Sequence, residues 1–213
     1  MRAFLCSAVL AVFALAAPRA SATVVVVPSL EEMTHRSNVV IHAVVRDVQT
    51  IKDEQGRLIT VNTLEVLDGI AGAKQADLVT VHQLGGRLGD EQAWIAGAHK
   101  FTVGEEVVFF GERLANKPAV VVPYGIGFGI FEVKEDVDGK HAHELGSHDV
   151  TQVVRLPDGR AQMTAVTPRR FDNLDAFKAQ LRAIRDGRNA PALPMKKMQR
   201  PQLKAPPVAP AKE

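Results

Sequence analysis

The feature that most limits the fold of this chain is a series of β-branched apolar runs separated by turn-forming residues, without helical stretches between them. The runs are Asn38–Ile51, Arg57–Gly69, Asp77–Gly86, Glu106–Leu114, Ala119–Gly125 and Phe128–Asp136. The first half of Asn38–Ile51 is apolar on both faces, and alternation begins at Arg46, which is typical of a strand that starts inside a barrel or sandwich and curls outward. Because no crossover helices separate the runs, the sheet is predicted to be antiparallel, with meander or Greek-key connections.

Turn-forming residues between the runs predict hairpins. These turns are Asp53–Gly56, Ala115–Pro118, Asp138–Gly139 and Pro157–Gly159. The apolar phase of the second run changes near its middle, which predicts a β-bulge at Asn62 or Thr63. The glycines of the segment YGIGFGIF alternate, and we interpret them as strand positions that permit tight coiling or close packing.

Two helices are predicted at the ends of the β-rich region. Ser29 and Glu32 form a capping box that starts a short helix through about His35. Asp172 can cap a second helix over residues 172–186, which Gly187 ends. Its apolar stripe consists of Leu174, Phe177, Leu181 and Ile184. The prediction is therefore one mainly β domain over residues 23–186, an OB/netrin-like antiparallel barrel or a sandwich, with a helix at each end.

The first residues have the pattern of a signal peptide. Arg2 precedes the apolar run Phe4–Ala17, which is short for a membrane span, and Ala20–Ala22 is an A-x-A cleavage box. Residues 1–22 are thus predicted to be removed between Ala22 and Thr23. The remaining chain has no cysteine and no transmembrane segment, and it is expected in the periplasm or outside the cell.

Residues 187–213 are predicted to be a disordered tail rich in Pro, Ala and Lys, with six of the chain's twelve prolines and no aromatic residue. The tail carries six basic residues and one acidic residue. Removal of Arg2 and Arg19 with the signal leaves 24 basic and 24 acidic residues, so the body is at −5. A basic tail on an acidic body would suit contact with an anionic surface or envelope polymer. The alternative is a solubilising tail without a partner.

The segment HAHELGSHD, residues 141–149, comes within one residue of the zinc-protease motif H-E-x-x-H. His143 and His148 are five residues apart, which places them on nearly opposite sides of a helix, and Gly146 disfavours a helix. On a strand, His141 and His143 would instead share a face, and His148 or Asp149 could complete a zinc or copper site. The alternative is a solvated hairpin with surface histidines. No other cofactor is predicted.

Other chemistry finds little support. No G-x-S-x-G motif is present, the predicted mature chain has no cysteine, and no catalytic residue is predicted. Nucleic-acid binding is not expected, because the body is acidic and contains one Trp and one Tyr. The loop before the segment GEE carries Arg87, Trp94 and His99, which are the predicted partner-binding residues. The alternative is that Trp94 caps the barrel core.

The chain contains, in order, the segments SLEEMTHRSNVVIHAVVRDV, LITVNTLEVLDGI, DLVTVHQLGG, GAHKFTVGEEVVFF and YGIGFGIFEV. A G-x-x-x-F-x-x-G-E-x-V-x-x-F block is formed by Gly97, Phe101, Gly104, Glu105, Val107 and Phe110. Over Pro28–Ile184 this layout resembles a group of exported, mostly uncharacterised bacterial β-domains. More distantly it is similar to the netrin-like, OB-type barrel of tissue inhibitors of metalloproteinases. That family inhibits through an N-terminal cysteine, which a chain starting at Thr23 lacks.

These observations predict an exported, non-enzymatic binding or accessory module of the bacterial envelope or secreted space, with a protein or an envelope polymer as its partner. One alternative is a metal-binding protein or metal-dependent enzyme that uses the hairpin of His141–Asp149. A further alternative is a peptidase inhibitor, implied only by the distant resemblance of the barrel.

Overall fold

The computed structural model describes residues 24–25, 27–145, 151–155, 161–188 and 196–197. Its helices are α2 (Leu30–Arg36) and α3 (Leu174–Arg185). Its strands are β1 (Val24–Val25), β2 (Val39–Lys52), β3 (Leu58–Ala71), β4 (Leu78–Leu84), β5 (Gly86–Leu88), β6 (Glu91–Ala93), β7 (Glu106–Leu114), β8 (Lys117–Pro123), β9 (Ile130–Asp136), β10 (Gly139–Glu144), β11 (Thr151–Arg155), β12 (Ala161–Ala165), β13 (Arg169–Phe171) and β14 (Lys196–Lys197). Neither helix in these residues is long enough to cross a membrane. The predicted signal peptide, its cleavage site and most of the predicted tail lie outside the described residues.

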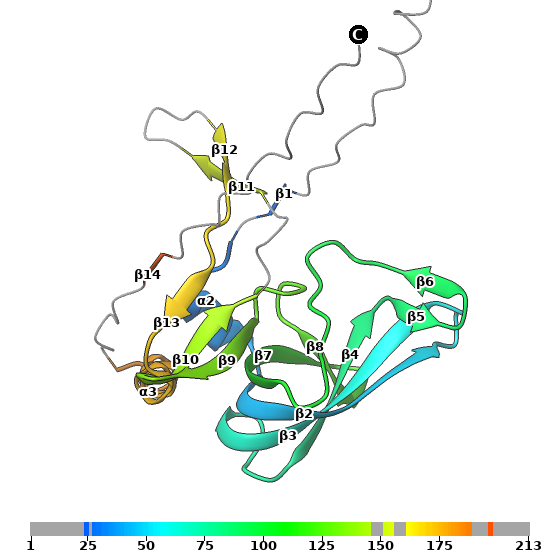
Figure 1. The fold of residues 1–213 in the computed structure, drawn as a ribbon, viewed down its shortest axis with the longest axis horizontal. Coiled ribbons are helices and arrows are strands. Elements are labelled where there is room, and N and C mark those ends of the chain that lie inside the picture. Colours follow the sequence, from blue (N-terminus) through cyan, green and yellow to red (C-terminus); the bar gives the residue numbers. More distant parts are fainter. Residues whose placement is uncertain (1–23, 26, 146–150, 156–160, 189–195, 198–213) are drawn as a thin grey trace, which may run out of the picture.

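Five strands form a closed ring in the order β7-β2-β3-β4-β8, because β8 pairs with both β4 and β7. Four of the five pairings are antiparallel, and the parallel one joins β4 to β8 through Thr80–Val120 and Val81–Val121. A five-stranded ring of this kind is an OB-type barrel. The structure therefore confirms a mainly β, largely antiparallel fold with a helix near each end, and it favours the barrel over the sandwich (Figure 1).

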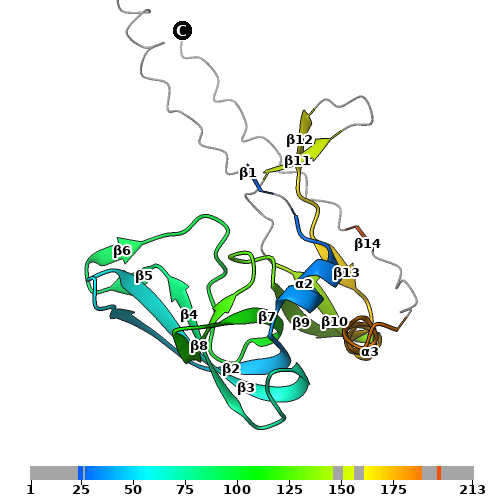
Figure 2. The same ribbon diagram turned by 180° about the vertical axis from the view of Figure 1, so that it is seen from behind.

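Beyond β7, the sheet continues outward as β9, β10, β13 and β14. The two helices pack against this extension, on the side of the molecule away from β5 and β6, as the two opposite views show (Figures 1 and 2). Two small sheets complete the fold: β5 pairs with β6, and β1, β11 and β12 form a separate three-stranded sheet.

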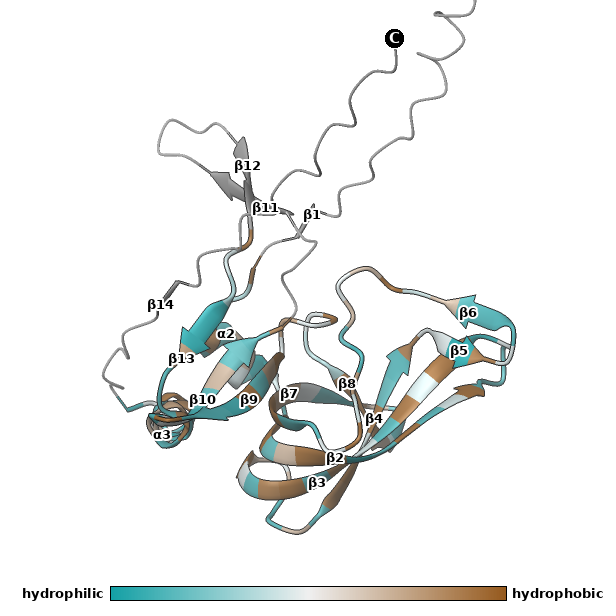
Figure 3. Cartoon of the chain, viewed as in Figure 1, coloured by the Kyte–Doolittle hydropathy of each residue, from teal (hydrophilic) through white to brown (hydrophobic). Residues whose placement is uncertain are grey.

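The strands β2 and β7 form a wall that two hydrophobic cores share. The barrel core contains Val39, Ile41, Ala43, Val45, Val107 and Phe109 from this wall. The second core contains Val40, Val108 and Phe110 from its other face, packed against Phe131, Phe177 and Leu181. Burial on both faces explains why the segment Val39–Val45 is apolar apart from His42, which is itself buried. The apolar positions concentrate along the ring strands, whereas β6 and β13 are mostly polar (Figure 3).

The predicted bulge in the second run was wrong in its position. Register is continuous between β3 and β4 around Asn62, which is fully buried and faces inward together with Leu64. The extra residue at this level is Arg46 of β2, which lies between the pairs Val45–Leu64 and Asp47–Thr63. Asn62 is polar but buried, so the inward positions of β3 run from Asn62 to Leu64 without an extra residue. Bulges of this kind coil a strand pair strongly, which helps to close the ring.

Two local predictions at the other elements also need correction. Asn173, rather than Asp172, caps α3, since its side-chain oxygen accepts a hydrogen bond from Ala176 N at 2.8 Å. The segment YGIGFGIF is a turn over residues 124–129 that leads into β9, rather than a strand. Close packing does occur there, because a Cβ on Gly129 would stand 2.7 Å from the carbonyl oxygen of Phe110. The cap of α2 is confirmed: Ser29 Oγ accepts from Glu32 N at 3.0 Å.

Candidate functional site

The loop between β4 and β7 carries the short strands β5 and β6 and folds over the end of the β2–β3 hairpin. Its close approach depends on Gly86, whose φ is +138° and whose added Cβ would stand 2.6 Å from the side chains of Thr50 and Thr60. An ion pair of 2.6 Å between Lys52 Nζ and Glu91 Oε1 joins β6 to β2. These contacts hold the loop against the barrel.

A cavity of about 190 Å³ lies between this loop and the barrel. Its apolar walls are Val48, Leu84, Trp94, Ile95, Ala98 and Phe101. Its polar lining includes Thr50, Thr60, Gln83, Arg87, His99 and Lys100. The two threonine hydroxyls lie 3.3 Å apart, and the hydroxyl of Thr60 donates to the carbonyl of Gly85 at 2.8 Å. The cavity is therefore an apolar hollow whose hydroxyl groups already have partners.

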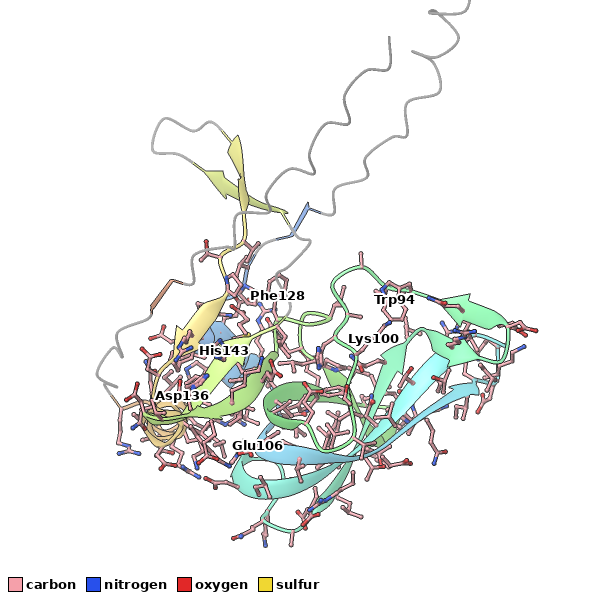
Figure 4. All side chains as sticks on the ribbon, viewed as in Figure 1. Trp94, Lys100, Glu106, Phe128, Asp136 and His143 are labelled. Atoms are coloured by element: carbon pink, nitrogen blue, oxygen red, sulfur yellow. The ribbon has the colours of Figure 1, made fainter. Side chains whose placement is uncertain are left out.

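Trp94 stands at the mouth of this cavity with 51% of its surface exposed. Lys100 Nζ lies 3.4 Å from the centroid of its ring, a cation–π contact across the loop (Figure 4). Phe101, which is 6% exposed, belongs to the barrel core and closes this end of it. Trp94 therefore presents a large ring at the surface, whereas Phe101, rather than Trp94, covers the end of the barrel core.

His99 is fixed by a chain of polar contacts that runs into the barrel. Its Nε2 lies 2.7 Å from Glu105 Oε1, and its ring packs edge-on against Phe101 with the centroids 5.1 Å apart. Its carbonyl accepts a hydrogen bond of 3.2 Å from Gln83 Nε2, and Gln83 in turn accepts 3.1 Å from Asn62 Nδ2. Glu105 also accepts from the backbone N–H of Thr102 at 2.9 Å. These hydrogen bonds to Gln83 and Asn62 of the barrel therefore fix the conformation of the loop.

The structure brings all three sequence-predicted partner-binding residues, Arg87, Trp94 and His99, to this one cavity. Arg87 is exposed, and its Nε donates to the carbonyl of Gly89 at 3.2 Å. Sequence reasoning missed Leu84, Ile95 and Lys100 because no local pattern distinguishes them from their neighbours. Their placement depends on how the loop folds back over β4.

The hairpin of His141 and His143 lies on the other half of the molecule, in β10 (Figure 4). The two rings share one face as predicted, with centroids 4.5 Å apart and planes at 73°. His141 Nδ1 lies 3.2 Å from Asp136 Oδ2, without the alignment of a hydrogen bond. His148 and Asp149 lie outside the described residues. Within the part of the chain that is described, no group of three or more His, Cys, Asp or Glu is arranged to hold a metal ion.

The surroundings of His143 keep it uncharged near neutral pH. Burial, together with the positive charges that His141 and Arg170 place beside it, lowers its pKa to about 4. Arg170 Nη1 lies 3.5 Å from His143 Nε2. A neutral imidazole is the form that binds metals, but a guanidinium beside its nitrogen opposes the approach of a cation.

A second histidine–carboxylate contact joins β2 to β7, and the side chain of Lys140 reaches it from β10. His42 is 6% exposed, and its Nε2 lies 2.7 Å from Glu106 Oε1. Burial lowers the pKa of His42, although the Glu106 carboxylate acts in the opposite direction. Burial would raise the pKa of Glu106, but hydrogen bonds from Lys140 and His42 outweigh it and lower the pKa. Both oxygens of Glu106 accept from Lys140 Nζ at 2.8 Å, so this group is a satisfied structural contact.

Comparison of the chain with protein-family models, with curated proteins and with solved structures gives no match. The candidate site therefore rests on its geometry: an exposed aromatic ring, two basic side chains and an apolar hollow lie together at the cavity beside Trp94.

Proposed function

We propose that this chain is an exported, non-enzymatic binding module that accepts an apolar side chain of a partner protein in the cavity beside Trp94. The observation that carries the proposal is the half-exposed Trp94 ring, held by Lys100 at the mouth of an apolar hollow. Exposed aromatic residues beside a desolvated pocket are the usual centres of binding energy at protein interfaces. Export is inferred from the signal-peptide pattern of residues 1–22 and from the resemblance to exported β-domains.

The size of the cavity decides the kind of ligand. Pockets for whole drug-sized ligands or cofactors occupy roughly 300–1,000 Å³. A cavity of about 150 Å³ accepts a single benzene ring. The hollow of about 190 Å³ therefore suits one aliphatic or aromatic side chain of a larger molecule. Its hydroxyl groups are bonded within the protein, so the cavity offers burial rather than a reactive centre.

Site-specific photo-crosslinking in the producing cells tests this function. A photoreactive residue at Ile95, in the cavity wall, is expected to give a discrete cross-linked product. The same residue at Val137, which is 102% exposed in the β9–β10 hairpin, serves as the control and is expected to give none. The product should disappear when Trp94→Ala is combined with the Ile95 probe. Equal products from both positions, or none from Ile95, would contradict the proposal.

The export proposal has its own measurement. N-terminal sequencing of protein recovered from the periplasm or medium should give Thr23 as the first residue. Recovery only from the cytoplasm, with Met1 or Arg2 first, would contradict export and leave the binding proposal to stand on the cavity.

A further inference from the structure

A second apolar hollow adjoins the cavity beside Trp94. It has a volume of about 230 Å³, and it shares Gln83, Leu84, Ile95 and Ala98 with the first. Its remaining lining residues are His82, Val122, Pro123 and Ile126. Leu84 and Ile95 line both hollows and thus form a ridge between them. We call the two hollows and this ridge the barrel-mouth groove.

The ridge and the far wall of the groove expose apolar side chains. Leu84 is 53% exposed, Ile95 37% and Ile126 49%. Ile126 also has a φ of +68°, a left-handed conformation that a β-branched residue rarely adopts. Strained residues of this type persist where the surrounding structure holds them and concentrate at binding sites. An exposed, strained isoleucine in this wall therefore supports a role in contact with a partner.

The charges around the groove lie at one end of it. Arg87 and Lys100 line the hollow beside Trp94, and within the described residues neither has an acidic side chain at ion-pair distance. Three acidic side chains nearby have partners: Glu91 pairs with Lys52, Asp53 with Arg57, and Glu105 with His99. Asp90, in the exposed turn between β5 and β6, forms no ion pair with Arg87 or Lys100. Two cations without an acidic partner stand on a body that is otherwise acidic, so this end of the groove favours a negative charge.

Resting on the function proposed above, we propose that the barrel-mouth groove binds an extended, acidic peptide segment of the partner. Two of its apolar side chains, two residues apart, enter the two hollows, and an Asp or Glu faces Arg87 and Lys100. Side chains on one face of an extended chain recur about every 7 Å, which suits neighbouring hollows that share a wall. A small ligand would fill one hollow and leave the ridge exposed. A peptide would fill both hollows and cover the ridge between them.

Trp94 is the chain's one tryptophan, so its fluorescence reports binding directly. The full chain is titrated with a blocked five-residue peptide that has two leucines two positions apart and an aspartate at each end. Two further peptides replace the aspartates by lysines or the leucines by threonines. The acidic leucine peptide is expected to bind at least about tenfold more tightly than either of the other two peptides. Its own affinity is expected to fall by a few-fold when the salt concentration is raised to 0.5 M.

Two leucines at opposite ends of β4 provide a matched pair of variants. Leu84→Gln removes the apolar side chain of the ridge and is expected to lower the affinity for the acidic peptide at least about fivefold. Leu78→Gln changes a 66% exposed leucine outside the groove and should leave the affinity unchanged. Thermal unfolding of both variants shows that a loss of binding is not a loss of folding. In Arg87→Gln/Lys100→Gln, measured by calorimetry, the preference for the acidic peptide should vanish.

The outcomes separate this inference from the function on which it rests. Equal binding of the acidic and basic peptides, or unchanged affinity in Leu84→Gln, would overturn the acidic-peptide inference and leave the cavity as a binding site. A cross-link from Ile95 without any peptide binding would also overturn it. A cross-link to a second copy of the chain would mean that this protein itself, rather than an acidic peptide of another protein, occupies the groove. Failure of both experiments would overturn the inference and the function together.

Discussion

Lys100 Nζ lies 3.4 Å from the centre of the Trp94 ring, so the two residues close the loop between β6 and β7 by a cation–π contact. The contact covers one face of a ring that is otherwise half exposed. It orders a stretch of chain without regular secondary structure directly over the cavity. The same ammonium group therefore both positions the aromatic ring and adds positive charge at the mouth of the groove.

The first prediction concerns this contact. Lys100→Ala should lower the free energy of unfolding by about 0.5–1 kcal/mol, which is the usual worth of an exposed cation–π pair. It should also raise the quenching of Trp94 fluorescence by neutral acrylamide, because the covered face of the ring opens. Lys100→Arg keeps a cation over the ring and should restore both values. A Lys100→Ala protein with unchanged quenching would show that the contact is not formed in solution.

The second prediction concerns the buried ion pair between Glu144 of β10 and Arg169 of β13. Glu144 Oε2 accepts from Arg169 Nε at 2.9 Å, Arg169 Nη2 donates to Glu144 Oε1, and the Glu144 side chain is fully buried. Glu144→Ala leaves the Arg169 guanidinium without its carboxylate partner. We therefore expect the free energy of unfolding, measured by urea titration, to fall by about 3–5 kcal/mol.

The exposed pair between Lys117 and Glu54, whose side chains are 58% and 81% exposed, is the control within the same protein. Glu54→Ala should change the free energy of unfolding by less than about 0.5 kcal/mol. Similar losses for Glu54→Ala and for the buried pair would contradict the view that β10 and β13 depend on a desolvated ion pair.

The third prediction is a pH dependence of stability that arises from His143. Its pKa is about 4 in the folded protein, lowered first by burial and then by His141, Arg170 and Lys134, against an ordinary value of 6.5. Between these two values the unfolded chain binds a proton that the folded chain does not, so the unfolded state gains stability on acidification. The free energy of unfolding should therefore be highest above pH 6.5 and fall by about 1–3 kcal/mol toward pH 4.

Comparison of variants isolates this contribution from that of other groups. His143→Gln should show a shallower decrease between pH 6.5 and 4, because the titrating ring is gone. His35→Gln, at an exposed position in the last turn of α2, should keep the slope of the original protein. Identical slopes in both variants would mean that the folded protein does not depress the pKa of His143.

The sequence allowed most strands to be located, because β-branched runs and turn residues are local signals. The run Asn38–Ile51 became β2 nearly residue for residue, and the stripe of α3 is buried as predicted. Closure of the ring was harder to predict from the sequence. It depends on two residue pairs between β4 and β8, and the residues of each pair lie about forty positions apart in the chain. The misplaced bulge has a similar origin: Asn62 is polar in the sequence and fully buried in the barrel.

The candidate site was predictable only in part. Arg87, Trp94 and His99 could be named because polar and aromatic residues in a long loop stand out by type. Their convergence on one cavity, and the role of Lys100, depend on a fold-back that no local pattern encodes. The left-handed conformation of Ile126 could not be foreseen, because the residue type argues against it.

The last prediction concerns metal binding by the hairpin of His141 and His143. The two rings share a face, but the Arg170 guanidinium lies 3.5 Å from His143 Nε2, where a metal ion would meet its positive charge. We therefore expect purified protein dialysed against zinc or copper to retain much less than one equivalent of metal. Arg170→Gln removes the opposing charge and should raise the retained amount if the charge is what prevents binding. One full equivalent in the unmodified protein, lost when His141 and His143 become alanine, would contradict this and establish the histidine pair as a metal site.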